Sequence, residues 1–238
     1  MIRVGTSGYN YPEWKGSFYP ETLSARKMLA YYAERFTTVE INYTFYRMPT
    51  DTIVSGWLAE TPPGFSFTLK APKRITHDRR LKECGDLVRQ FCGVAAGLAD
   101  RLGVLLFQLP PNLKCNLDVL DAFLDELPPR VRAAFEFRNA SWLTEDVYSR
   151  LRQRNLALCI ADTGDTTTPL VSTADYGYLR LRDEGYAEPD LVAWAARVRQ
   201  HAEWQDAFVY FKHEDEGRGP EFAATFVGAL NQPLPTVP

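Results

Sequence analysis

The chain has 238 residues, of which 45% are hydrophobic and 24% charged, and its formal net charge is −3. This length suits one large domain with a substantial core. The net charge excludes a protein that is attracted to nucleic acid or membranes by its overall electrostatic field. No apolar run is long enough to cross a bilayer. The first residues enter a strand pattern directly, so we expect a cytoplasmic protein without a signal peptide. The four cysteines have no C-x-x-C spacing, which favours reduced thiols.

Eight segments have the composition of buried β-strands, and most are apolar on both faces, as parallel strands between helices are. They are residues 2–6, 38–42, 65–70, 104–109, 131–142, 156–161, 176–181 and 207–212. Apolar residues at helical spacing separate nearly all of them. The predicted helices are residues 21–36, 50–60, 81–102, 116–127, 145–154, 189–204 and 220–230.

Local signals support these helices, because Thr50 and Asn116 are suitable N-caps and Pro189 suits a first helical turn. Residues 163–175 show no helical period, so the sixth helix is expected to be weak or missing. Eight strand–helix units predict an α/β fold, a compact single-domain TIM (β/α)8 barrel over residues 1–232 with a frayed tail at 233–238. An open doubly wound sheet is the alternative.

Ionisable side chains share one face on two of the predicted strands. Glu40 and Asn42 do so on the second strand, and Glu136 and Arg138 do so on the fifth. Ionised groups are costly to bury unless they are paired or used in function. Because active sites of such barrels lie at the C-terminal ends of the strands, we expect Glu40 and Glu136 to meet in one pocket.

Three acids are candidates for catalysis at this rim: Glu40, Glu136 and Asp162 could each be a general base, a metal ligand or the partner of a cation. His77 could serve as acid, base or ligand. With three histidines in the chain, a histidine-rich zinc site is disfavoured, so the metal hypothesis is one divalent ion on Glu40 and Glu136. The alternative is a structural ion pair between these glutamates and Arg138 or Arg180.

The other candidates would hold a substrate. A basic loop follows the third strand, an arginine can clamp a carboxylate or phosphate, and aromatic side chains can stack on a ring. The predicted binding residues are Tyr9, Trp14, Asn42, Tyr46, Lys70, Lys73, Arg74, Gln108, Arg138, Trp142, Arg180 and Lys212.

Several motifs in the expected order resemble the YecE-like family, known as domain of unknown function 72. They include Gly-Thr-Ser-Gly-Tyr at 5–9, Val-Glu-Ile-Asn at 39–42, Leu-Phe-Gln-Leu-Pro-Pro at 106–111, Glu-Phe-Arg at 136–138 and Tyr-Leu-Arg-Leu at 178–181. The resemblance implies a TIM barrel and a cytosolic bacterial or archaeal protein, and it implies no reaction. The chain departs from the family pattern at Arg182-Asp183 and at 212–217, where the family usually has His-Gly and often an Asn-rich stretch.

Three functions fit these observations. The leading hypothesis is a hydrolase or lyase acting on a phosphorylated or otherwise anionic substrate, either a small molecule or nucleic acid. The second is a metal-free glycosidase that uses Glu40 and Glu136 as its carboxylate pair. The third is a non-catalytic module that binds nucleic acid or a phosphorylated metabolite through the basic loop.

Overall fold

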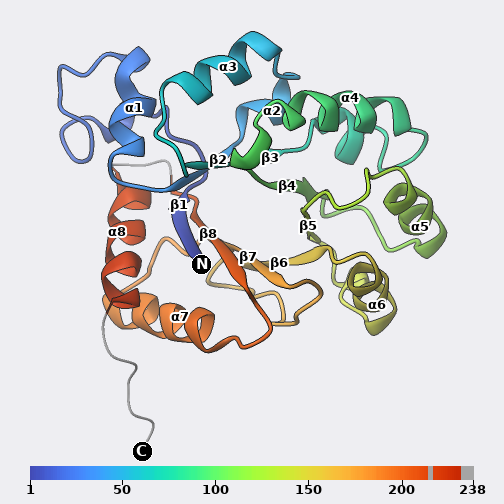
Figure 1. Cartoon of the computed structure of the whole chain (residues 1–238). Coiled ribbons are helices and arrows are strands. Elements are labelled where there is room, and N and C mark those ends of the chain that lie inside the picture. The colour runs from blue at the N-terminus through green and yellow to red at the C-terminus, as the bar shows by residue number, and fades with distance from the viewer. Residues whose placement is uncertain (214–216, 232–238) are drawn as a thin grey trace, which may run out of the picture.

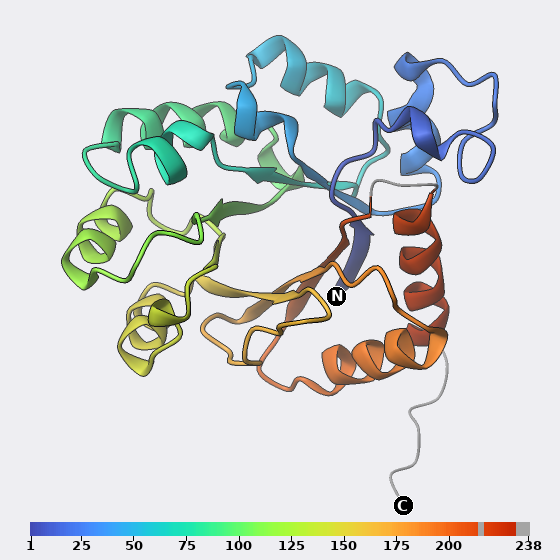
Figure 2. The ribbon, with the colours of Figure 1, turned by 180° about the vertical axis from the view of Figure 1, so that it is seen from behind.

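The computed structural model describes residues 1–213 and 217–231, and it confirms the predicted α/β barrel (Figures 1 and 2). Helices surround eight parallel strands, and each strand lies within a segment expected from the sequence or overlaps it with bounds shifted by one or two residues. The strands are β1 (Ile2–Thr6), β2 (Thr38–Ile41), β3 (Ser66–Lys70), β4 (Leu102–Gln108), β5 (Ala133–Glu136), β6 (Ala157–Asp162), β7 (Tyr176–Leu181) and β8 (Asp206–Phe211). The tail expected at 233–238 lies outside the described residues.

The sheet runs in the order β1-β8-β7-β6-β5-β4-β3-β2, and all its pairs are parallel. The ring approaches closure between β1 and β2, where Ser7 bridges Glu40 and the Gly8 amide donates a hydrogen bond to the Glu40 carbonyl at 2.7 Å. A Cβ at Gly5 would lie 2.0 Å from the Thr38 carbonyl oxygen, so glycine permits the close approach of these strands. This contact draws Glu40 to the C-terminal end of β1.

The helices are α1 (Met28–Ala33), α2 (Tyr43–Tyr46), α3 (Asp51–Ala59), α4 (Gly85–Ala96), α5 (Leu117–Asp125), α6 (Glu145–Gln153), α7 (Glu188–Gln200) and α8 (Arg218–Leu230). Both predicted N-caps are confirmed, because the side chains of Thr50 and Asn116 accept from backbone amides three residues further on. Residues 163–175 contain no helix, as predicted. No helix in the described part of the chain is long and apolar enough to cross a membrane.

Two predicted helices are longer than those observed. The helix expected at 81–102 starts only at Gly85, because Arg80, Leu81 and Glu83 have positive φ angles, which an α-helix cannot contain. The helix expected at 21–36 is reduced to α1, which follows a short 3₁₀ turn at Ala25–Lys27. The patterns at 81–102 and 21–36 identified each helix but neither its first turn nor its end, because α4 ends at Ala96 and α1 at Ala33.

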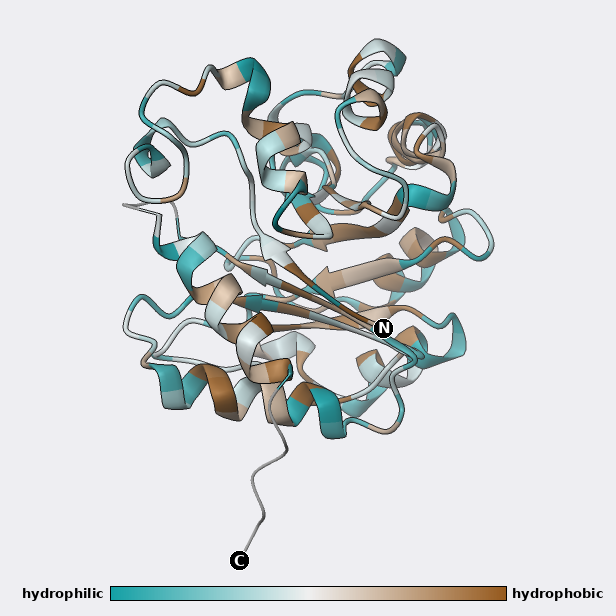
Figure 3. Cartoon of the chain, turned by 60° about the vertical axis from the view of Figure 1, so that its left-hand side comes forward, coloured by the Kyte–Doolittle hydropathy of each residue, from teal (hydrophilic) through white to brown (hydrophobic). Residues whose placement is uncertain are grey.

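The protein has two apolar regions, one between the strands and the helices and a smaller one inside the barrel. Figure 3 shows the strands mainly in brown, with teal concentrated on loops and on parts of the helices. The smaller region contains aliphatic residues of β4 and β5 together with Tyr176, Tyr178 and Tyr210. The hydroxyl of Tyr210 lies 2.8 Å from those of Thr38 and Thr68, so the barrel interior becomes polar before its C-terminal end.

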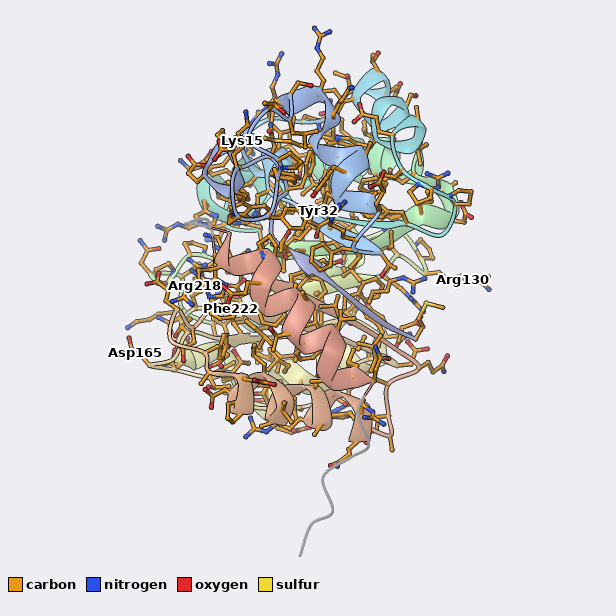
Figure 4. The ribbon with its side chains drawn as sticks, turned by 90° about the vertical axis from the view of Figure 1, so that its left-hand side faces the viewer. Lys15, Tyr32, Arg130, Asp165, Arg218 and Phe222 are labelled. Atoms are coloured by element: carbon orange, nitrogen blue, oxygen red, sulfur yellow. The ribbon has the colours of Figure 1, made fainter. Side chains whose placement is uncertain are left out.

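The aromatic loop after β1 packs against α1 and the adjoining strands. Trp14 is fully buried, and its ring stacks on Tyr19 at 6.1 Å between centroids. Tyr32 of α1, labelled in Figure 4, donates to the Thr38 carbonyl and accepts from the Thr6 amide. This loop therefore covers the junction of β1 and β2.

Candidate functional site

Arg180 lies between two buried glutamates at the C-terminal ends of the strands. Its Nη2 donates to Oε1 of Glu40 at 2.9 Å, and its Nη1 donates to Oε2 of Glu136. The three side chains are 0%, 0% and 1% exposed, respectively. The structure therefore brings Glu40 and Glu136 into one cluster, as expected, but joins them through an arginine from β7.

Every carboxylate oxygen of this pair has a protein partner. Ser7 donates to Oε1 of Glu40 at 2.6 Å, and the Tyr178 hydroxyl donates to Oε2. Arg138 donates through Nε to Oε1 of Glu136 at 2.8 Å. Burial alone would raise the pKa of Glu136, but Arg180 and Arg138 lower it to about 2, so this carboxylate stays ionised at neutral pH.

These contacts bear directly on the expected divalent metal. A metal bound by Glu40 and Glu136 would have to displace the Arg180 guanidinium, which already neutralises both carboxylates. Across residues 1–213 and 217–231, no group of three or more His, Cys, Asp and Glu side chains has a geometry that could hold a metal ion. The residues present therefore do not fit the metal site that the sequence suggested.

Positive charge exceeds negative charge at this end of the barrel. Arg138 also donates through Nη2 to Oε1 of Gln108 at 3.1 Å, leaving its Nη1 without a hydrogen bond among the described residues. Arg182 lies 3.7 Å from Glu136 and its side chain donates no hydrogen bond to any described residue. Burial lowers the pKa of Arg182 below its ordinary value, and attraction to Glu136 offsets this only in part. The charge of Arg182 is therefore only partly neutralised by the described residues.

A cavity of about 480 Å³ opens between the ends of β5, β6 and β7. Two cations, Arg138 and Arg182, and four threonines are among the residues that line it. Its lining residues are Pro111, Glu136, Phe137, Arg138, Asn139, Ala140, Leu143, Ala161, Thr163, Thr166, Thr167, Thr168 and Arg182. We call this cavity the Arg138–Arg182 pocket. The threonines come from the segment between β6 and β7 that contains no helix.

Lys70, at the end of β3, is 9% exposed and its ammonium forms no ion pair or hydrogen bond with a described residue. Its Nζ lies 4.2 Å from the centroid of the Phe45 ring, a cation–π contact. Burial, and then the charge of Arg180, lowers the pKa of Lys70 to about 8. A carboxylate partner would normally keep such an amine charged, so Lys70 differs from the arginines beside it.

His77 lies close to Lys70, within a single π-helical turn at Arg74–Asp78. Its ring meets Phe45 edge-on at 5.0 Å, and its Nδ1 is 2.9 Å from the Thr76 hydroxyl. Burial and the charges of Lys70 and Arg138 lower the pKa of His77, so its imidazole is neutral at neutral pH. The structure thus places this predicted residue near the carboxylate–arginine cluster.

Several predicted site residues have structural surroundings instead. Asp162 accepts hydrogen bonds from Tyr186 at 2.6 Å, Trp194 at 3.1 Å and Thr167 at 2.8 Å, so its carboxylate ties β6 to α7 and holds one threonine of the pocket wall. Trp142 is buried against Phe137, with 8° between the rings, and donates to the Leu113 carbonyl. Trp142 and the buried Trp14 therefore offer no open face to a ligand, contrary to our expectation.

The remaining predicted residues lie away from the Arg138–Arg182 pocket. Tyr46 is 81% exposed, and Lys73 and Arg74 are exposed on the surface of the basic loop. Tyr9 and Asn42 line a separate cavity of about 380 Å³ at the ends of β1 and β2. Lys212 is half-buried directly after β8.

Sequence reasoning missed two parts of the pocket, Arg182 and the threonines at 163–168. Arg182 follows Arg180 on the same strand face, which was the available signal. The threonines carried no periodic signal, because they lie in a loop. Of the stretch 212–217 that departs from the family pattern, residues 214–216 lie outside the described residues.

A family model described as "Protein of unknown function DUF72" matches residues 3–238. Among curated proteins, UPF0759 protein YecE of Escherichia coli (strain K12) is 31% identical over 157 residues, which cover 66% of this chain and 55% of that protein. UPF0759 protein YunF of Bacillus subtilis (strain 168) is 28% identical over 159 residues and is also covered to 55%. The alignments thus span about half the length of these relatives.

Solved structures resemble the chain over its whole length. A DUF72 family protein from Thermotoga maritima has a TM-score of 0.87 at 28% identity, covering 98% of this chain and 100% of that one. A DUF72 family protein from Enterococcus faecalis gives 0.80 at 19% identity, covering 98% and 96%. A glycoside hydrolase family 5 enzyme from Prevotella bryantii gives 0.51 at 12% identity over 96% of each chain, a likeness of fold alone.

Proposed function

The chain belongs to the DUF72 family of proteins of unknown function, and from this premise we propose that it is an enzyme acting on a small anionic substrate. The substrate carries a phosphoryl or carboxylate group, which Arg138 and Arg182 hold in the Arg138–Arg182 pocket. Two arginines that converge on one cavity can donate several charge-assisted hydrogen bonds to such a group.

The observation that carries this proposal is the incomplete pairing of Arg182. Its side chain is 24% exposed, it donates no hydrogen bond to a described residue, and its nearest carboxylate is 3.7 Å away. Glu136 is already bonded to Arg180 and Arg138 and cannot also neutralise Arg182. An anion in the pocket would supply the missing charge and hydrogen-bond acceptors.

The size of the pocket favours a small molecule over nucleic acid. Its volume of about 480 Å³ lies in the usual range for small-molecule sites, roughly 300–1,000 Å³. The surface cations that could track a nucleic-acid backbone, Lys73 and Arg74, are exposed on the loop after β3 and do not line it.

The two glutamates position the arginines in this proposal. A glycosidase needs one carboxylic acid that is free to protonate its substrate, whereas Glu40 and Glu136 are both buried and both accept hydrogen bonds from Arg180. The carboxylate-pair glycosidase therefore gains no support from this geometry. We assign acid–base catalysis to Lys70 and His77. Burial lowers the pKa of Lys70 to about 8 and lowers the pKa of His77 from its ordinary value.

Thermal unfolding with and without inorganic phosphate and pyrophosphate tests the proposal. Both anions should raise the Tm, because they bind the folded state alone. Arg182→Gln should weaken binding by about tenfold to hundredfold, the equivalent of one charge-assisted hydrogen bond. Arg26→Gln, which removes the same charge from an exposed position, is the matched control. Equal anion affinity in Arg182→Gln and Arg26→Gln would refute the proposal.

A further inference from the structure

Lys70 has the surroundings of a reactive amine. It ends β3, at the edge of the barrel where the carboxylate–arginine cluster lies, and its side chain is packed against Phe45. The Thr44 hydroxyl donates to the Lys70 carbonyl at 2.6 Å and fixes the backbone that carries the amine. Burial and the neighbouring cations favour the nucleophilic, uncharged form of this amine, while the cation–π contact with Phe45 favours its ammonium form.

A purely structural lysine would normally be placed differently. Ammonium groups that are buried for stability are paired with carboxylates, and the glutamates of this cluster are bonded to Arg180, Arg138, Ser7 and Tyr178 instead. The burial of Lys70 therefore costs stability, as functional groups commonly do.

We propose that Lys70 is a nucleophile that forms an imine with an anionic carbonyl compound, an oxo acid or a phosphorylated aldehyde or ketone. The inference rests on the proposed function, because Arg138 and Arg182 hold the anionic group of this substrate. Lys70 does not itself line the Arg138–Arg182 pocket, but it lies near enough to Arg138 for their charges to interact. It narrows the reaction to one that proceeds through a lysine-bound imine, within the lyase class.

The step balances without a further reactant. The Lys70 amine attacks the carbonyl carbon, forming a C–N bond while the C=O π electrons take up a proton to give a carbinolamine. The carbon–oxygen bond then breaks and water leaves, so an ammonium group and a carbonyl yield a protonated imine and one water molecule. We assign the acceptance and return of the proton to His77, whose ring contacts Phe45 as the Lys70 ammonium does.

Borohydride trapping tests this proposal on the full chain. The protein is incubated at neutral pH with pyridoxal 5′-phosphate, with pyridoxal or with glyoxylate, reduced, and mapped by mass spectrometry. The phosphorylated aldehyde should label Lys70 about tenfold or more faster than the exposed Lys114, since each pKa unit changes the amine-to-ammonium ratio tenfold. Inorganic phosphate should slow the labelling of Lys70 alone.

Variants separate this inference from the proposed function. Lys70→Arg should lose the adduct and keep phosphate binding, whereas Lys114→Arg should lose only its own adduct. Arg182→Gln should slow labelling by pyridoxal 5′-phosphate and leave labelling by pyridoxal unchanged. Each variant is first checked for the wild-type circular dichroism spectrum, and phosphate protection of the wild-type protein needs no variant.

Three results would overturn the inference. If phosphate binds in an Arg182-dependent way but neither aldehyde nor glyoxylate forms an adduct at Lys70, the amine is not the nucleophile and the anion pocket stands. If Lys70 reacts equally with pyridoxal and its phosphate, with no effect of Arg182→Gln, the anionic substrate class is wrong and the proposed function fails with it. Labelling spread evenly over exposed lysines refutes a special role for Lys70.

Discussion

The two ends of the barrel each carry an arginine–carboxylate cluster, and the clusters differ chiefly in burial. At the N-terminal end, Arg132 donates to Asp206 at 2.8 Å, and the N-terminal ammonium lies 3.2 Å from the same carboxylate. Their side chains are 37%, 27% and 72% exposed, respectively. At the C-terminal end, Arg180 and its two glutamates are at most 1% exposed.

The difference shows that arginine–carboxylate pairs depend on burial for their effect on stability. Water already solvates the N-terminal cluster, so pairing there adds little. At the C-terminal end each charge depends on its neighbours, and removing one leaves another buried and unpaired. We propose chemistry at the end of the barrel whose charges are buried and interdependent, whereas the ion pairs at the opposite end are partly solvated.

The largest expected effect comes from removing Arg180. Arg180→Met would leave Glu40 and Glu136 buried without their common cation, and we expect the free energy of unfolding to fall by about 3–5 kcal/mol. Arg132→Met, the matched change at the other end, should cost at most about 1 kcal/mol. Urea unfolding measures both. Similar losses in the two variants would contradict the contrast between the two clusters.

The second largest effect is expected in the pH dependence of stability, which should reflect the buried cluster at the C-terminal end. The folded pKa of Glu136 is about 2, below its unfolded value of about 4.3. Its contribution to the free energy of unfolding is therefore complete at pH values above the unfolded pKa and declines as the pH falls toward 2. Urea unfolding between neutral and acid pH should show a shallower slope in Glu136→Gln than in wild type, by up to about 1.4 kcal/mol per pH unit. Equal slopes would mean that Glu136 is not held ionised by its arginines.

The smallest effect is expected at Asp206. Asp206→Asn removes a partly exposed ion pair, so the free energy of unfolding should change by less than about 1 kcal/mol. The loss should shrink further at high salt, because exposed charges are screened. A comparison of melting temperatures at low and high ionic strength measures this. A large loss that salt does not change would place Asp206 in the same class as Glu136.

The fold could be predicted because its signals are local and repeated. Alternating strand and helix patterns, the N-caps Thr50 and Asn116, and the absence of a helical period at 163–175 each depend on neighbouring residues. Helix starts were less predictable, since the positive φ angles around Leu81 depend on how that turn packs.

The sequence predicts which polar residues lie at the C-terminal ends of the strands, but not how these residues contact one another. Period-two alternation gave the shared faces of Glu40 and Glu136, and parallel strands brought them to one end of the barrel. Alternation does not say which side chains pair across the barrel. The ion pair of these glutamates with Arg138 or Arg180 was therefore predicted only as an alternative, which the structure confirms, and the incomplete pairing of Arg182 was not predicted. Asp162 ends a strand as well, but it faces Trp194 of α7, which sequence position alone does not reveal.

The segment between β6 and β7 is held to the barrel at both of its ends by hydrogen bonds of threonine side chains. Thr167 is tied to Asp162 at 2.8 Å, and the Thr173 hydroxyl accepts from the Leu158 amide and donates to the Leu156 carbonyl, both at 2.7 Å. Between these anchors the segment supplies one wall of the Arg138–Arg182 pocket. Substitutions there can alter ligand selectivity without disturbing strand packing, so we expect this short stretch to be where related proteins evolve different specificities on a shared scaffold.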